Sequence, residues 1–142
     1  MRRLVADAGL AGRIEVCSAG IGDWHAGNPA DPRSAEAMRR HGYDARGHRA
    51  RQVSRQDLVD HDMIVAMDRG HASDLARMLP AGARGEVRLL LSYDPSSAVL
   101  DVPDPYYGGP SGFDDVLAMI ESACRCLLDE VRRDLPAAST DD

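Results

Sequence analysis

The chain has 142 residues, a formal net charge of −6, 44% apolar residues and 28% charged residues. A chain of this length forms one domain that buries about 68–70% of its unfolded surface, and the composition excludes a disordered or fibrous protein. All 17 basic residues are arginine, and ten of them lie in residues 1–55 together with six acids. No run of five or six like charges marks a nucleic-acid-binding tail, so we expect no nucleic-acid partner.

The start of the chain does not have the apolar segment of a secretory signal, because Asp7 interrupts "MRRLVADAGLAG". No stretch is long and apolar enough to predict a membrane span. The cysteines Cys17, Cys124 and Cys126 are an odd number in a chain without secretory features. These features predict a cytoplasmic protein with reduced thiols and no membrane partner.

A first helix is predicted over residues 1–10, which carry an apolar stripe at helical spacing. It has no capping side chain, and Arg2 and Arg3 lie at the positive end of its dipole. A helix ahead of the first strand should cross over from an earlier strand, and the sequence contains none. We therefore expect the chain to begin in the middle of a helix.

Three short segments, residues 13–18, 62–67 and 86–91, are predicted to be strands. Each is apolar on both faces, which is typical of a parallel sheet covered by helices on both sides. Helices alternate with these strands, so the sequence predicts a three-layer α/β fold.

Capping signals delimit the helices between the strands. A helix over residues 31–42 begins at the N-cap Asp31 and ends at a glycine. A helix over residues 54–61 opens with Ser54 and Asp57 in a capping-box relation.

The two remaining helices are predicted over residues 68–79, which end before Pro80, and over about residues 113–135. The last helix has its acids early and its arginine pair late, as the helix dipole favours. Its apolar stripe consists of Phe113, Val116, Leu117, Ile120, Leu127, Leu128, Val131 and Leu135. We expect one domain over residues 1–135 and a disordered tail over residues 136–142.

Five segments carry a resemblance to a known family. They are "SAGIGDWHAGNPADPRS", "HRARQ", "DMIVAMD", "LLLSYDP" and "DVPDPYYGG". In this order and spacing the chain resembles the low-molecular-weight protein-tyrosine phosphatases along nearly all its length. The resemblance implies a flavodoxin-like parallel sheet with flanking helices, with the family's first strand missing from this chain.

The resemblance also implies an activity, the hydrolysis of phosphotyrosine in proteins or of small aryl phosphates through a cysteinyl-phosphate, without a metal or an organic cofactor. Asp104 of "DPYY" would protonate the departing oxygen and then deprotonate water. Trp24, Tyr106 and Tyr107 would form the walls of an aromatic slot for the substrate. The alternative for "DPYYGG" is a turn whose tyrosines cover the edge of the core.

Two further residues match family positions that support the phosphate loop through hydrogen bonds. They are Ser18 and His48, which by themselves are equally well interpreted as a strand-end residue and a solvated loop histidine. The other four histidines have no metal-ligand spacing with cysteines or carboxylates and are predicted to lie on the surface.

The family's nucleophile loop, of the form Cys-x5-Arg, has no convincing counterpart. The match Cys126 to Arg132 lies inside the last predicted helix, where backbone amides bond to the preceding turn and cannot hold a phosphate. Cys17 and Cys124 are predicted to be small core residues. We therefore expect the 142-residue chain to be inactive. It would also expose two strand edges that could support a homodimer or an exchange of elements.

Two alternatives belong to other functional classes. One is a catalytically inactive, phosphatase-like module for binding or oligomerisation. The presence of Asp104, Trp24 and Tyr106 counts against this module, because a protein without catalysis has no need to keep the acid. The other is an arsenate reductase, which shares the sheet and a cysteine loop but does not need the aromatic acid loop.

Overall fold

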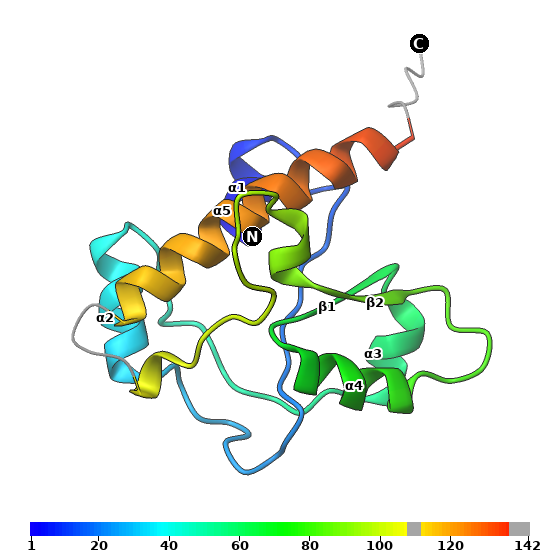
Figure 1. The fold of residues 1–142 in the computed structure, drawn as a ribbon, viewed down its shortest axis with the longest axis horizontal. Helices are drawn as coiled ribbons and strands as arrows, with labels where there is room; N and C mark the ends of the chain where they lie inside the picture. The colour runs from blue at the N-terminus through cyan, green and yellow to red at the C-terminus, as the bar shows by residue number, and fades with distance from the viewer. Residues whose placement is uncertain (108–111, 137–142) are drawn as a thin grey trace.

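The computed structural model describes residues 1–107 and 112–136, so nearly all of the predicted disordered tail lies outside the described residues. In chain order the elements are α1 (Arg2–Asp7), α2 (Pro32–Arg40), α3 (Arg55–Asp60), β1 (Met63–Ala66), α4 (Arg69–Met78), β2 (Glu86–Leu89), the 3₁₀ helices η1 (Leu90–Tyr93) and η2 (Pro105–Tyr107), and α5 (Gly112–Asp134). Helices α1 and α2 lie beside α5, while β1, β2, α3 and α4 are grouped together (Figure 1).

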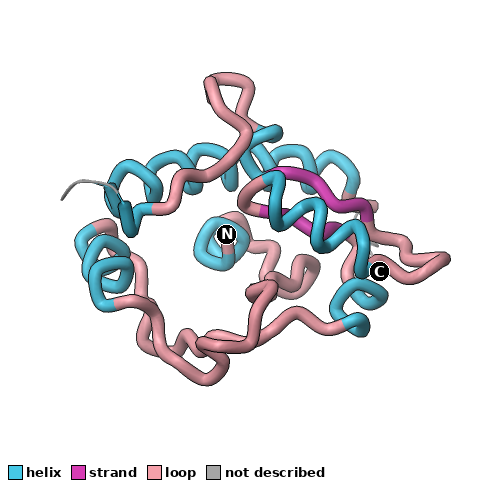
Figure 2. The backbone as a smooth tube through the Cα atoms, turned by 60° about the horizontal axis from the view of Figure 1, so that its bottom comes forward, coloured by secondary structure: helices cyan, strands magenta, loops and turns pink. Residues whose placement is uncertain are grey.

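The sheet consists of β1 and β2, which pair in parallel with Met63 opposite Glu86 and Ala66 opposite Leu89. Figure 2 shows the two strands side by side, with α4 as the connection between them. The predicted strand over residues 86–91 is shorter in the structure, because the chain turns into η1 at Leu90.

The sheet separates two hydrophobic clusters. The α3–α4 cluster has a buried core of Leu58, Ala66 and Leu75. The α5 cluster has a buried core of Leu90, Leu91, Tyr93, Ala123, Cys124 and Leu127. Along β1, Ile64 packs on the α3–α4 cluster and Val65 packs on the α5 cluster, because successive side chains of a strand point to opposite faces. This arrangement confirms the predicted three-layer α/β fold.

The helices begin where the capping signals placed them. The Asp31 carboxylate accepts hydrogen bonds from the amides of Arg33 and Ser34 at the start of α2. Ser54 and Asp57 form the predicted capping box of α3. Helix α1 has no capping side chain, as its sequence predicted.

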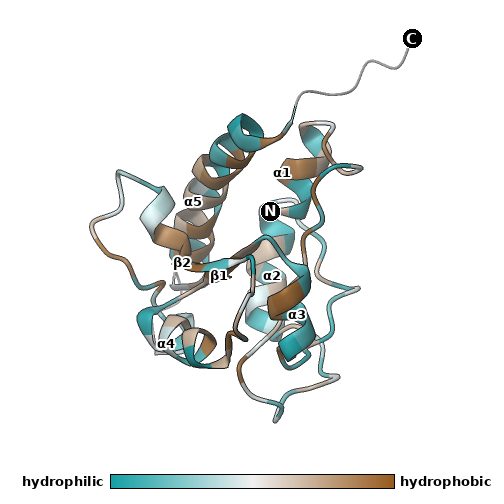
Figure 3. Ribbon diagram, turned by 90° about the vertical axis from the view of Figure 1, so that its right-hand side faces the viewer, coloured by the Kyte–Doolittle hydropathy of each residue, from teal (hydrophilic) through white to brown (hydrophobic). Residues whose placement is uncertain are grey.

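Helix α5 carries its apolar side chains on one stripe, and Figure 3 shows hydrophobic and hydrophilic colours alternating along it. Its buried residues, Ala123, Cys124, Leu127 and Leu128, repeat at helical spacing, and the first three pack with residues of η1 in the α5 cluster. Across residues 1–107 and 112–136, no helix combines the length and the apolar character that a bilayer crossing requires.

The prediction of a strand over residues 13–18 is wrong. After a turn at Arg13 this segment has no regular secondary structure, and the Val16 carbonyl accepts a hydrogen bond from the Arg2 side chain. The nearest strand-like pairing is an isolated parallel bridge between Gly20 and Gln52. A strand needs a partner that completes its hydrogen-bond ladder, and within the described residues this segment has none.

Candidate active site

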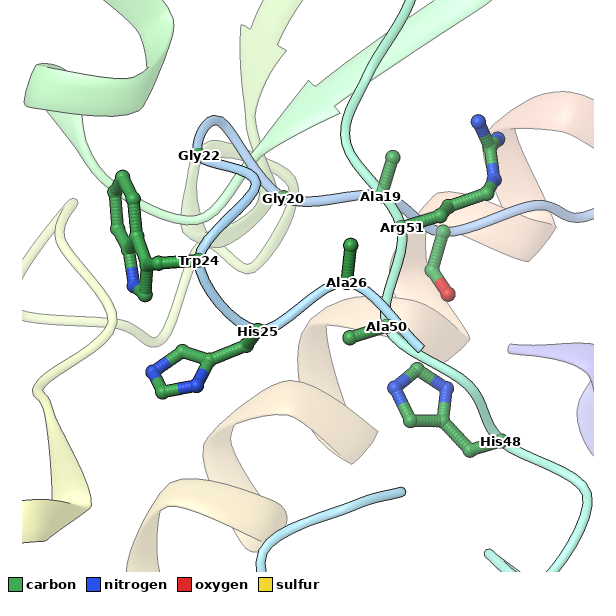
Figure 4. Close-up of a pocket in the computed structure, with 10 residues that line it drawn as sticks. Ala19, Gly20, Gly22, Trp24, His25, Ala26, His48, Ala50 and Arg51 are labelled. Atoms are coloured by element: carbon green, nitrogen blue, oxygen red, sulfur yellow. The ribbon is translucent and has the colours of Figure 1, made fainter. Parts of the chain in front are cut away.

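A hollow of about 340 Å³ lies between residues 18–26 and residues 48–51 (Figure 4). Backbone hydrogen bonds hold these two segments together, from the Gly20 amide to the Arg51 carbonyl at 2.8 Å and from the Gly27 amide to the Ala50 carbonyl at 2.8 Å. The residues that line it include Ser18, Trp24, His25, His48 and Arg51. Residues that are 30 positions apart in the sequence thus share one cavity.

Trp24 provides the aromatic wall of this hollow and is 76% exposed. Its ring covers Gly22 so closely that a Cβ on Gly22 would lie 1.8 Å from a ring carbon. His25 meets the indole edge-on, with ring centroids 6.3 Å apart and planes inclined by 68°. The loop thereby presents a flat aromatic face that an aryl group can pack against.

Arg51 contributes a cation whose charge is already paired. Its two terminal nitrogens donate to the Asp57 carboxylate at 2.7 and 2.9 Å, and Figure 4 shows its side chain directed away from Ala26 and Ala50. Hydrogen bonds from Arg51, and then from Ser54, hold the pKa of Asp57 well below its usual range. Arg51 therefore ties the edge of the hollow to the start of α3.

Ser18 and His48 are both among the residues that line the hollow. Among the described residues neither side chain takes part in a hydrogen bond, since the His48 contacts involve its backbone amide and carbonyl. Their supporting role for a phosphate loop stays a prediction.

One end of the acid loop, residues 101–107, lies beside the carboxyl end of β1. The Val102 amide donates to the Met67 carbonyl at 2.9 Å, and Asp101 accepts a fork of hydrogen bonds from Arg69. Ligands of open parallel sheets bind outside the carboxyl ends of the strands, so the loop is placed where chemistry is expected.

Asp104 is exposed within this loop, and its carboxylate accepts the Tyr106 amide at 2.9 Å. Asp104 is not among the residues that line the hollow. The structure therefore brings together three of the predicted site residues, Ser18, Trp24 and His48, and leaves the predicted acid outside their lining.

Tyr106 lies on the far side of the loop from β1 and contacts a cation. The guanidinium carbon of Arg33 lies 4.1 Å from the centroid of the Tyr106 ring and 5.1 Å from that of Phe113. Tyr106 is 59% exposed. The side chain of Tyr107, predicted as a second wall residue, lies outside what the structure describes.

None of the three cysteines has the surroundings of a phosphate nucleophile. Cys17 is exposed, which corrects its prediction as a core residue, and its sulfur approaches Glu15 at 3.6 Å. Cys124 is buried, as predicted, and burial raises the pKa of its thiol, which disfavours the thiolate. Cys126 lies in the middle of α5, where the backbone amides are bonded within the helix.

The site also contains residues that the sequence did not single out. His25 and Arg51 line the hollow, and Arg33 contacts Tyr106. All three lie inside the segments that carry the family resemblance. Their position in these segments was the one sequence feature that could have identified them as site residues. In the described part of the chain, no three His, Cys, Asp or Glu side chains are grouped to hold a metal ion.

Comparisons with known proteins give matches that agree with one another. A family model described as "Low molecular weight phosphotyrosine protein phosphatase" matches residues 1–137. A low molecular weight protein-tyrosine-phosphatase of Streptomyces coelicolor is 47% identical over 134 residues, covering 92% of this chain and 81% of that protein. Two solved structures are similar: YfkJ from Bacillus subtilis (TM-score 0.86, 41% identity, 95% of this chain and 84% of that one) and a protein tyrosine phosphatase from Entamoeba histolytica (TM-score 0.88, 27% identity, 94% and 85%). The chain therefore belongs to the low molecular weight phosphotyrosine protein phosphatase family.

Proposed function

We propose that this protein hydrolyses aryl phosphate monoesters, with protein phosphotyrosine as its substrate class, and that Asp104 is the general acid and base. The observation that carries the proposal is the hollow shared by Ser18, Trp24 and His48. Ser18 and His48 are 30 positions apart in the sequence, and the family resemblance assigns all three residues to the surroundings of a phosphate-ester site. The names of the relatives, which are protein-tyrosine phosphatases, support the same substrate class.

The chemistry proceeds in two steps. A cysteine thiolate attacks phosphorus, the bond from phosphorus to the aryl oxygen breaks, and the Asp104 carboxyl gives its proton to that oxygen. The Asp104 carboxylate then takes a proton from water, whose oxygen attacks the phosphocysteine. This step releases inorganic phosphate and restores the thiolate. Trp24 would hold the aryl ring, because a deep aromatic wall favours phenyl phosphates over shorter alkyl ones.

The nucleophile is the component that residues 1–142 do not provide. Cys17 has Asp23 rather than an arginine six residues further on, and Cys124 and Cys126 lie within α5. A thiolate needs free backbone amides and a nearby cation to hold the phosphate and lower its own pKa. We infer that the nucleophile loop belongs to the complete protein and that the 142-residue chain is inactive by itself.

The test is p-nitrophenyl phosphate hydrolysis by the 142-residue chain and by its Asp104→Asn variant. We expect no turnover by either. Robust turnover that disappears in Asp104→Asn but persists in Asp62→Asn, an exposed control, would show that residues 1–142 already contain the nucleophile. In a protein that carries the nucleophile loop, Asp104→Asn should lower kcat by about 10²–10⁴-fold.

A second candidate, a phosphatase-like module without catalysis, is favoured by the surroundings of the three cysteines. The mass of the protein purified from its native source separates the two proposals. A mass near 15.4 kDa favours the module, whereas a mass larger by a few kilodaltons favours the phosphatase.

A further inference from the structure

We propose that Arg33 is a positioning residue for Asp104: it holds the far end of the acid loop on α2 through the ring of Tyr106. The proposal rests on the function proposed above. Arg33 lies on the first turn of α2, and its guanidinium carbon is 4.1 Å from the Tyr106 centroid and 5.1 Å from the Phe113 centroid. One cation thereby joins α2, the acid loop and the start of α5.

Arg33 is itself held in a fixed orientation. Its Nε lies 3.3 Å from Asp31 Oδ1 and its Nη2 lies 3.3 Å from Asp31 Oδ2, which forms a fork. Asp31 is in turn fixed as the N-cap of α2 by the amides of Arg33 and Ser34. The hydrogen bond from Arg33 lowers the pKa of Asp31 to about 2, so the carboxylate stays charged at neutral pH. The planar cation thus has one edge on Asp31 and a face available to an aromatic ring.

Tyr106 links this clamp to the acid. Its backbone amide donates to Asp104 Oδ1 at 2.9 Å, so the residue whose ring rests on Arg33 also orients the carboxylate. The start of α5 lies beside the loop, since a Cβ built on Gly112 would be at van der Waals distance, 3.4 Å, from the Pro105 carbonyl. A displacement of about 1 Å in a catalytic group costs on the order of 10²-fold in rate, which is why such positioning matters.

The opposite end of the loop has its own attachment. Arg69 forms a fork on Asp101, with its Nη2 2.8 Å from Oδ2, and the Val102 amide donates to the Met67 carbonyl. Asp104 therefore lies between two arginine anchors, Arg69 near β1 and Arg33 on α2. Loss of Arg33 would leave the loop attached at the β1 end, with Asp104 free to move.

The first test uses NMR relaxation of the 142-residue chain and needs no activity. We compare Arg33→Met with Arg39→Met, a matched control on α2 whose guanidinium pairs with Glu36 on the surface. In Arg33→Met we expect the order parameter of the Tyr106 amide to fall from a rigid value of about 0.85 to below about 0.6, while Arg39→Met leaves it unchanged. Arg33→Lys should resemble Arg33→Met, because an ammonium cannot form the planar fork and stack.

The thermal midpoint of each variant is measured alongside, so that loss of the whole fold is distinguished from release of the loop. A rigid Tyr106 amide in a folded Arg33→Met variant would overturn the proposal. This result is independent of whether the chain is an enzyme, since the order parameter reports the mobility of the amide that donates to Asp104.

The second test applies to a preparation that carries the nucleophile loop. Removal of Arg33 should lower kcat/KM for phenyl phosphate about tenfold more than kcat/KM for p-nitrophenyl phosphate. The leaving group p-nitrophenol is more acidic than phenol, so its departure depends less on a proton from Asp104. An equal loss on both substrates, in a variant whose Tyr106 amide is mobile, would overturn the link to the acid. The Asp104→Asn variant tests the proposed function separately, since it removes the acid and leaves the clamp.

Discussion

The indole of Trp24 occupies the space that a side chain on Gly22 would need. A Cβ built on Gly22 would lie 1.8 to 2.3 Å from three carbons of the Trp24 ring. The ring is exposed, so it can move aside at little cost in stability. The shape of the hollow therefore depends on the absence of one methyl group.

We predict that Gly22→Ala displaces Trp24 while leaving the protein folded. Trp24 is the single tryptophan of the chain, so its fluorescence reports this residue alone. The emission spectrum and its quenching by acrylamide should change in Gly22→Ala and stay as in the parent in Gly12→Ala, because a Cβ on Gly12 meets nothing within 4 Å. Identical spectra for Gly22→Ala and the parent would contradict the described ring position.

At the scale of elements, α3 depends on a carboxylate that serves two partners. Asp57 accepts the Ser54 amide at 2.8 Å in the capping box and also receives the Arg51 fork. Ser54→Ala should lower the free energy of unfolding by about 1 kcal/mol, as for other N-caps.

Asp57 should also make stability depend on pH. Its folded pKa lies below its unfolded value of about 3.9, so its contribution is complete above that pH and is lost as the pH falls towards the folded pKa. We predict that urea unfolding shows a deficit for Asp57→Asn that is constant above about pH 5 and shrinks below pH 4. The control Asp60→Asn, at the exposed C-terminal end of α3, should show a smaller deficit at neutral pH. A deficit for Asp57→Asn that persists unchanged at low pH would contradict this account.

Local signals were predictable at this scale, and non-local ones were not. The caps at Asp31 and Ser54 depend on amides two or three residues away, so the sequence alone located them. The segment 13–18 has the composition of a strand, but a strand exists only through its partners, and composition does not report them. Arg33 was missed for the same reason, because its contact with Tyr106 joins residues 73 positions apart.

The candidate site shows the same division. The family resemblance identified Ser18, Trp24 and His48, and the fold brings all three to one hollow. It did not determine where the Asp104 carboxylate points, because that depends on the bond to the Tyr106 amide and on the anchors of the loop. Motifs therefore predicted three residues that share one hollow, whereas packing decides how the side chains are oriented.

For the whole molecule, the two-stranded sheet is the boundary between two cores. Leu58 belongs to the α3–α4 cluster and Leu91 to the α5 cluster, and each is 1% exposed. The two leucines share no cluster, because each cluster packs on a different face of β1. Truncations at the two positions should therefore act on separate packing environments within one cooperative fold.

We predict that Leu58→Val and Leu91→Val each lower the free energy of unfolding by about 1 kcal/mol, the usual loss for one buried methylene. The double variant should lose the sum of the two within about 0.5 kcal/mol, because residues without shared contacts behave additively. Urea unfolding followed by circular dichroism measures all three, with Leu100→Val as an exposed control that should change little. A double variant that departs from additivity by more than about 1 kcal/mol would mean that the sheet transmits packing changes from one core to the other. The acid loop, whose β1 end is attached through Met67, would then be sensitive to core substitutions on both faces.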